Sequence, residues 1–280
     1  MIKSILICTD GSAYGDVASE YAIHLASRLK AQLAGLHVLD SRMLEGPMLS
    51  DISGMLGAEP FSAQLEQFRE IMEGKGETVM KLLGERAGHA SLDLESRVRM
   101  GHPSRVILDE EVSAELLILG QKGEHAEMIG DLLGSNVERI VRRSCKPCLV
   151  TPAEFVPVTK ILAAFDGSAI SSKALHEGIE LAQALAVPLL ILTVRAHPSD
   201  RYAEDIAETG MKLARAHGCV AARLVVEGRP SEEILEVAHK QGCNLIVIGA
   251  YGHSSIREWI IGSTTAHLIH QTDLPVMLVR

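Results

Sequence analysis

The sequence predicts an α/β fold written twice: two tandem, doubly wound parallel sheets of five strands each, flanked by helices. Three observations support this prediction. The chain of 280 residues repeats its own landmarks in the same order. Short β-rich runs alternate with helical stretches in each half. The runs 116–119 and 245–248 are apolar throughout, as expected for strands of a parallel sheet that helices cover on both faces.

The repeat spans whole domains. Segments 5–12, 101–104, 116–120, 134–135 and 146–150 recur as 161–168, 228–231, 245–249, 262–263 and 274–278. This period is far longer than that of a solenoid repeat, so it indicates duplication of a complete domain. We therefore expect one domain at 1–152, a second at 158–280, and a short proline-flanked linker around 152–157.

Apolar periodicity places the elements within each half. In the first half we expect strands at 4–9, 32–39, 92–99, 116–119 and 148–151. In the second half we expect them at 160–165, 189–195, 221–226, 245–248 and 275–279. Between the first two strands, residues 16–29 place Val17, Tyr21, Leu25 and Leu29 on one helical face.

The two halves differ in length between the second and third strands. Asp10 and Asp166 are 156 positions apart, whereas Gly101 and Gly228 are 127 apart. The first half therefore carries about 29 extra residues, which we expect around 41–61 as a long loop with one helical turn. Loops of this length in compact domains are usually lids, binding loops or disordered segments.

Composition excludes several classes of protein. The formal net charge of -9 argues against a protein that binds nucleic acid or anionic membranes. No apolar run is long enough to span a bilayer, and the apolar stretch at the N-terminus is too short for a signal peptide. Five cysteines, an odd number in a long chain, favour reduced thiols and a cytoplasmic location.

A glycine-rich segment follows the fourth strand of the second half. Gly249 and Gly252 are followed by nine residues and then by Gly262 and Ser263 at the start of an expected helix, 263–271. Glycines let a backbone approach a ligand closely, and the N–H groups at a helix start favour a phosphate. The alternative is a plain glycine turn in which Ser263 caps the helix.

Taken together, the motifs resemble those of the universal stress protein family. They are Asp-Gly-Ser after the first strand, the glycine segment after the fourth, and Pro-Val before the last. The resemblance covers the whole chain as two tandem copies. It implies a Rossmann-like fold of the adenine nucleotide alpha hydrolase type, in a family whose members either bind ATP through the glycine segment or lack it.

For the second half, the resemblance implies a complete nucleotide site. The nucleoside is expected beside Asp166 and the backbone of Val194. Ribose and phosphates are expected at the glycine segment and the helix that follows, with one histidine as an added donor. These residues are Gly249, Gly252, His253, Gly262, Ser263 and Thr264.

The first half matches the same pattern with one departure. The matching residues are Asp10, Val38, Gly120, Gly123, Gly134 and Ser135. Ten residues, not nine, separate Gly123 from Gly134, and three of them are acidic: Glu124, Glu127 and Asp131. Carboxylates repel a triphosphate unless a divalent ion intervenes or they point away. Occupancy of one site per chain, in the second half, therefore stays an alternative to occupancy of both.

Two other patterns are interpreted structurally. Cys145 and Cys148 form a CxxC at the end of a helix, opposite to the arrangement of a thioredoxin-like motif, so a structural role is expected. His267 and His270 share a predicted helix face, but no glutamate accompanies them in an HExxH pattern, so no metal site is expected. No spacing in the chain indicates a nucleophile or a general base.

We expect a cytoplasmic tandem universal stress protein that binds ATP or a related adenine nucleotide, together with Mg²⁺, in a stress-response or regulatory role. Any hydrolysis is expected to be slow. The alternatives are a nucleotide-independent interaction module and, less favoured, an adenylylating enzyme. We expect no nucleic-acid or membrane partner, and the protein partners are not identified. The last strands of the two halves are expected to pair as an internal pseudo-dimer, and a homodimer of whole chains stays open.

Overall fold

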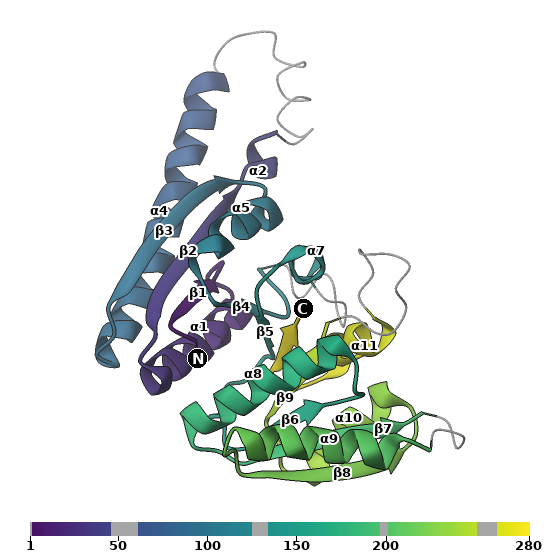
Figure 1. Ribbon diagram of the computed structural model, residues 1–280. Coiled ribbons are helices and arrows are strands. Elements are labelled where there is room, and N and C mark those ends of the chain that lie inside the picture. Colours follow the sequence, from purple (N-terminus) through teal and green to yellow (C-terminus); the bar gives the residue numbers. More distant parts are fainter. Residues whose placement is uncertain (1, 46–60, 125–133, 197–200, 251–261) are drawn as a thin grey trace.

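The computed structural model describes residues 2–45, 61–124, 134–196, 201–250 and 262–280 (Figure 1). Its ten strands form one sheet in the order β3-β2-β1-β4-β5-β10-β9-β6-β7-β8. The two predicted five-stranded parallel sheets are the two halves of this sheet. Each half has the same strand order, and the order reverses between β1 and β4 in the first half and between β6 and β9 in the second.

The strands agree with the prediction to within two residues at each end. In the first half they are β1 Ser4–Cys8, β2 Gln32–Asp40, β3 Leu94–Gly101, β4 Leu116–Gly120 and β5 Cys148–Thr151. In the second half they are β6 Ile161–Ala164, β7 Leu189–Arg195, β8 Ala221–Glu227, β9 Leu245–Gly249 and β10 Val276–Val279.

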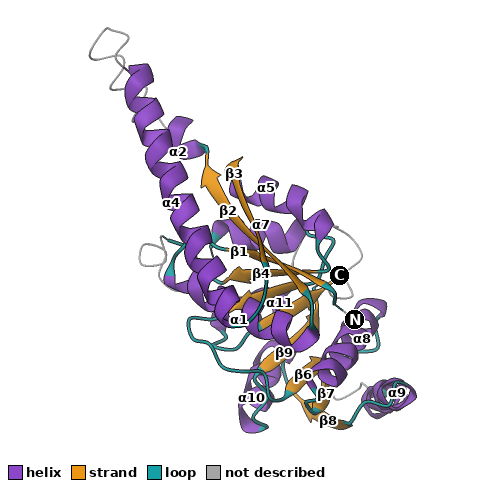
Figure 2. Cartoon of the chain, turned by 90° about the vertical axis from the view of Figure 1, so that its left-hand side faces the viewer, coloured by secondary structure: helices purple, strands orange, loops and turns teal. Residues whose placement is uncertain are grey.

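Helices cover both faces of the sheet (Figure 2). One face carries α1 Ala13–Leu29, α4 Phe61–His89, α8 Ala169–Leu185 and α9 Ala203–Ala216. The other carries α5 Pro103–Glu110, α7 Ser135–Arg143, α10 Pro230–Lys240 and α11 Ser263–Gln271. Two shorter elements are α2 Arg42–Glu45 and the 3-10 turn η1 Glu111–Ser113. Among the helices of the described residues, none has the length and apolar character needed to cross a membrane.

Side chains alternate between the two faces of each strand. Ile5 and Ile7 of β1 belong to the core beneath α1 and α4, whereas Leu6 and Cys8 belong to the core beneath α5 and α7. This is the two-residue period of a strand that is buried on both sides. Both cores run without a break from the first half into the second.

The two halves join through β5 and β10, the antiparallel pair of the sheet. Leu149 lies opposite Met277, with Val150 opposite Val276 and Cys148 opposite Leu278. All four residues of each strand are buried. The predicted pairing of the two last strands within one chain is therefore confirmed.

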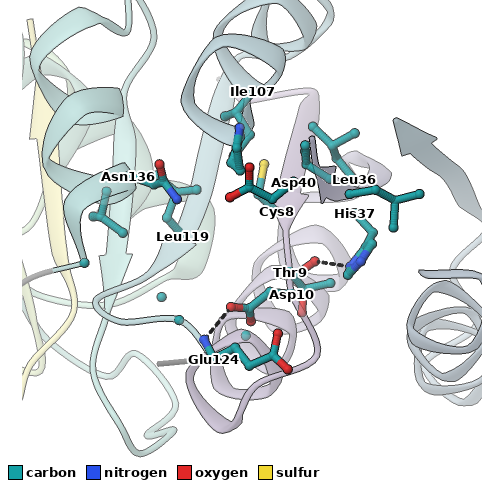
Figure 3. Close-up of a pocket in the computed structure, with 18 of the residues that line it drawn as sticks. Cys8, Thr9, Asp10, Leu36, His37, Asp40, Ile107, Leu119, Glu124 and Asn136 are labelled. Carbon is teal, nitrogen blue, oxygen red and sulfur yellow. Dashed lines mark hydrogen bonds between the residues drawn. The ribbon is translucent and has the colours of Figure 1, made fainter. Parts of the chain in front are cut away.

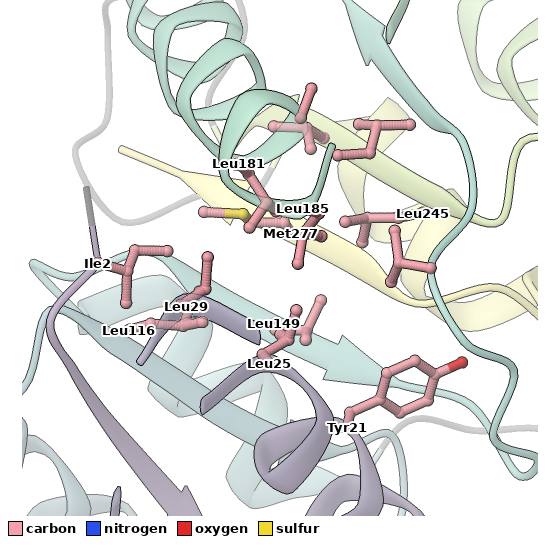
Figure 4. Packing of buried hydrophobic residues seen from close by; sticks show 14 of the residues in the cluster. Ile2, Tyr21, Leu25, Leu29, Leu116, Leu149, Leu181, Leu185, Leu245 and Met277 are labelled. Carbon is pink, nitrogen blue, oxygen red and sulfur yellow. The ribbon is translucent and has the colours of Figure 1, made fainter. Parts of the chain in front are cut away.

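Helices α1 and α8 cover this seam on one face of the sheet (Figure 4). Leu25 and Leu29 of α1 meet Leu181 and Leu185 of α8 above the paired strands (Figure 4). The backbone also contributes, because the guanidinium of Arg28 donates a hydrogen bond to the carbonyl of Leu185 at 2.6 Å.

The sequence predicts the extra residues of the first half around 41–61, but in the structure they extend beyond this range into α4. The expected helical turn is present as α2, residues 46–60 lie outside the described residues, and α4 has 29 residues where α9 has 14. Residues 66–71 of the added part are all exposed. Leu65, Phe68 and Met72 nevertheless recur there at helical spacing, so the sequence carries a helical period that the expectation of a loop did not use.

Gln121 connects the two halves on the other face of the sheet. It follows β4 directly and is buried, and its amide nitrogen donates to the carbonyls of Ile269 (3.1 Å) and Thr272 (2.9 Å) at the end of α11. The C-terminal carbonyls of a helix have no partner within the helix, so a donor from outside satisfies them. The corresponding position in the second half is Ala250, which has no polar side chain.

We expect the change Gln121→Ala to lower the free energy of unfolding by about 1–3 kcal/mol, because two buried carbonyls lose their donor. Denaturant unfolding followed by circular dichroism measures this difference. Gln183→Ala is the matched control, because the Gln183 amide also donates to a carbonyl, that of His217, but on the exposed surface. It should change the free energy by no more than about 0.5 kcal/mol. Equal effects of the two changes would contradict a special role for the buried contact.

Candidate functional site

The Asp-Gly-Ser motif forms the same turn in both halves. The carboxylates of Asp10 and Asp166 each accept a hydrogen bond from the N–H two residues further along, at 3.0 Å and 2.9 Å. Between them, Gly11 and Gly167 have φ values of +80° and +79°, a conformation that other residues rarely adopt. The turn therefore fixes an aspartate at the carboxyl end of the first strand of each half.

A cavity of about 430 Å³ opens beside Asp10 in the first half (Figure 3). It lies at the carboxyl ends of β1, β2 and β4, where the strand order reverses and where ligands of doubly wound sheets bind. The cavity brings together five of the six residues predicted for this half, Asp10, Val38, Gly120, Gly123 and Gly134. The sixth, Ser135, is the first residue of α7, directly after Gly134.

The walls of the cavity differ in character. Strands and helices α5 and α7 supply an apolar wall, which contains Leu36, Ile107, Leu119, Val137 and Ile140. The opposite wall is polar and contains the glycine loop and charged side chains. An apolar slot with a few placed polar groups is typical of small-molecule sites.

Two of the predicted glycines are explained by close packing. A Cβ on Gly120 would lie 2.8 Å from the carbonyl oxygen of Tyr14, and one on Gly249 would lie 2.7 Å from Cγ2 of Ile170. Tyr14 and Ile170 occupy corresponding positions in α1 and α8. These glycines therefore allow the first helix of each half to approach the fourth strand.

Gly123 contacts the aspartate itself. A Cβ there would lie 2.6 Å from Oδ2 of Asp10, and the next residue, Glu124, donates its backbone N–H to the same oxygen at 2.7 Å. The glycine loop of the first half is thus tied to the end of β1 (Figure 3).

The acidic character of this loop is partly neutralised. Glu124 forms an ion pair with Lys75 of α4, with 2.5 Å between Oε1 and Nζ. The repulsion expected from this carboxylate is therefore reduced. Glu127 and Asp131 lie outside the described residues.

A second ion pair stands at the α2 end of the cavity. Asp40 accepts hydrogen bonds from Nε of Arg42 at 2.8 Å and from Nη2 at 2.5 Å. Partial burial would raise the pKa of Asp40, but the hydrogen bonds and charge of Arg42 outweigh it and hold this pKa below its usual value. Asp40 is therefore an anion whose negative charge is balanced by Arg42 in the cavity wall.

His37 adds a buried imidazole to the first half. Its Nδ1 lies 2.9 Å from the carbonyl oxygen of Thr9, so this nitrogen carries the proton that bonds to it. Burial lowers the pKa of His37, and the bond to Thr9 and the nearby Asp10 oppose this only in part. In the second half Thr193 makes the equivalent bond, from its hydroxyl to the carbonyl of Phe165 at 2.9 Å. His37 is one of the residues that line the cavity.

The residues missed from the sequence come mainly from α2 and α4. Arg42 and Met43 lie on α2, Met72 and Lys75 lie on α4, and Asn136 follows Ser135 on α7. None of these belongs to a motif. The excess length of the first half indicated an insertion, and Leu65, Phe68 and Met72 recur within it at helical spacing, but neither signal gave the direction of α4.

The second half places its described residues at the corresponding positions. Asp166 follows β6, Val194 and Gly249 lie at the ends of β7 and β9, and Ser263 and Thr264 begin α11. Gly262 is the N-cap of that helix, so the alternative in which Ser263 caps it is wrong. Gly252 and His253 lie outside the described residues.

The described cysteines are free thiols, and the burial of Cys148 argues against redox chemistry at the CxxC. Cys145 is exposed, whereas Cys148 is buried in β5. Burial raises the pKa of Cys148 to about 12, although a hydrogen bond with Ser144 opposes it. A thiol that stays protonated is a poor nucleophile. Cys148 therefore acts as an apolar strand residue.

Comparison with known proteins agrees with this architecture. The universal stress protein family model matches twice, at residues 1–152 and 157–280. A universal stress protein of Synechocystis is 33% identical over 100% of both chains, and one of Mycolicibacterium smegmatis is 26% identical over 99% of this chain and 96% of its own. The crystal structure of a universal stress protein from Archaeoglobus fulgidus has a TM-score of 0.77 at 19% identity, covering 98% of this chain and 97% of that chain. The chain therefore belongs to the universal stress protein family, as a tandem member with two copies of the domain.

Proposed function

We propose that this protein binds ATP or a related adenine nucleotide at the strand ends of its halves and acts as a regulatory binding protein in stress responses. The observation that carries the proposal is the first-half cavity. It combines an apolar wall with Asp10, residues of the glycine segment and the N-terminus of α7.

Each part of the cavity fits one part of a nucleotide. The flat base fits the apolar wall, where the backbone at Val38 offers polar groups to its edge. A ribose has hydroxyl donors for the carboxylate of Asp10. The phosphates fit the start of α7 at Gly134 and Ser135, because the N–H groups of the first helical turn and the helix dipole favour an anion there.

Magnesium enters this proposal with the nucleotide. Within the described ranges of the chain, no group of three or more His, Cys, Asp or Glu side chains could hold a metal ion. We therefore expect Mg²⁺ to be carried by the phosphate oxygens, as is usual for this cation.

The first half is the better-defined candidate, although the sequence motif favours the second. Five predicted residues of the first half line one cavity, and the pairing of Glu124 with Lys75 reduces the repulsion that its carboxylate would exert on a phosphate. In the second half the matching positions Asp166, Val194, Gly249 and Ser263 support the same proposal.

We expect the purified protein to bind Mg²⁺-ATP when titrated by calorimetry up to millimolar nucleotide. Occupancy should also raise the midpoint of thermal unfolding, because a ligand that binds the folded state stabilises it. The stoichiometry distinguishes the alternatives: one nucleotide per chain indicates that a single half binds, and two indicate that both halves bind. Absence of both heat and thermal shift would favour the nucleotide-independent interaction module. Release of many AMP or pyrophosphate molecules per chain would instead favour the adenylylating enzyme.

The change Gly123→Val should remove binding to the first half, with at least a tenfold loss of affinity. The valine side chain would occupy the space of the Asp10 carboxylate, because even its Cβ would lie 2.6 Å from Oδ2. Calorimetry measures the loss of nucleotide affinity, under conditions in which the variant and the unchanged protein are both folded. Gly88→Ala is the control, since a Cβ at this position on α4 meets nothing within 4 Å. Unchanged binding in Gly123→Val would exclude the first-half cavity as a nucleotide site.

A further inference from the structure

We propose that Lys75 of α4 recognises the phosphate part of the ligand in the first-half cavity, and that Glu124 competes with that phosphate for Lys75. This inference rests on the proposed nucleotide site and names the residues that set its phosphate affinity. Neither residue is among those predicted to bind the nucleotide, and the corresponding positions of the second half hold Tyr202 and His253.

The first step of the argument is the length of α4. Val79 packs against Gly11, and Ile206 of α9 packs against Gly167 in the same way, so these positions correspond. By this alignment Lys75 corresponds to Tyr202, which precedes α9 and is 71% exposed. The turns of α4 before Gly76 are therefore an addition to the first half, and they bring Met72 and Lys75 to the cavity.

The second step is the place where the ammonium group lies. Nζ of Lys75 is 2.5 Å from Oε1 of Glu124, whose own N–H bonds to Asp10. Lys75 therefore reaches across the cavity from α4 to the start of the glycine loop. A phosphate bound beside Gly123 and Glu124 would meet the same ammonium group.

The third step compares the cations in the cavity wall, Arg42, Lys75 and Lys122. Arg42 is held by Asp40 through two side-chain nitrogens, and Lys122 lies 5.8 Å from the centre of the Tyr14 ring. Lys75 is bound to Glu124 in a pair whose side chains are 50% and 54% exposed.

An exposed lysine–carboxylate pair contributes about 1 kcal/mol or less to stability, so its exchange costs little. A phosphate carries more charge than one carboxylate and forms strong charge-assisted hydrogen bonds. Phosphate should therefore displace Glu124 from Lys75. In the absence of nucleotide, Glu124 keeps the lysine at the mouth of the cavity.

The test measures affinity for ATP and for adenosine, which lacks phosphate, by calorimetry and by competition. The first-half signal is the part of the isotherm that Gly123→Val removes. We expect Lys75→Gln to weaken ATP binding about fivefold and Glu124→Gln to strengthen it by two- to fivefold. Adenosine binding should stay unchanged in both. Lys75→Arg should retain most of the ATP affinity, and Lys75→Gln with Glu124→Gln should behave like Lys75→Gln alone.

Two controls make these results specific. Lys81→Gln and Glu85→Gln remove one positive and one negative charge from exposed positions of α4 that do not line the cavity. Both changes should leave ATP affinity unchanged. Equal loss of ATP and adenosine affinity in Lys75→Gln would overturn the inference, because it indicates a structural role. Equal effects of Lys81→Gln and Lys75→Gln would overturn it as well. If Gly123→Val removes no signal at all, the proposed site itself fails, which is a different result.

Discussion

The antiparallel pairing of β5 with β10 is the contact on which the whole arrangement depends. Every other strand pair is parallel, so the strand direction reverses at this seam. Each half on its own would expose the edge of its last strand, and an exposed edge invites association with other chains. Pairing the two edges removes this problem and merges both cores. It also makes the carboxyl ends of the strands in the two halves point in opposite directions.

The two halves keep the same framework but differ where the framework allows it. The bond that joins the first two strands at their ends is made by His37 in one half and by Thr193 in the other. Both side chains donate to a backbone carbonyl, so either residue is compatible with the fold. The two residues would differ in a ligand site, because an imidazole and a hydroxyl offer different surfaces to a ligand. The long helix α4 and its Lys75 extend this difference to charge.

The fold could be predicted from the sequence because its signals are local. Apolar runs, alternating periods and the Asp-Gly-Ser turn each depend on residues close together in the chain. Because the domain is duplicated, each of these signals occurs in both halves of the sequence. The cavity could be predicted only in part, since its other wall depends on contacts between distant residues. Lys75 and Glu124 are 49 positions apart. The turns of α4 that bring them together carry Leu65, Phe68 and Met72 at helical spacing, so a helix could have been predicted there, but its position beside the glycine loop could not.

A fused pair of domains can hold contacts that a symmetric pair cannot. In a dimer of identical chains with two-fold symmetry, every contact across the interface occurs twice. Here Gln121 reaches from the glycine loop of the first half to the end of α11, while Ala250 at the matching position makes no such side-chain contact. The N-terminal end of α11 is capped by Gly262, which belongs to the second-half candidate site. One helix of nine residues, about 13 Å long, therefore lies between the two candidate sites, and its connection to the first loop exists in one direction only. Duplication within a single chain is what permits this asymmetry.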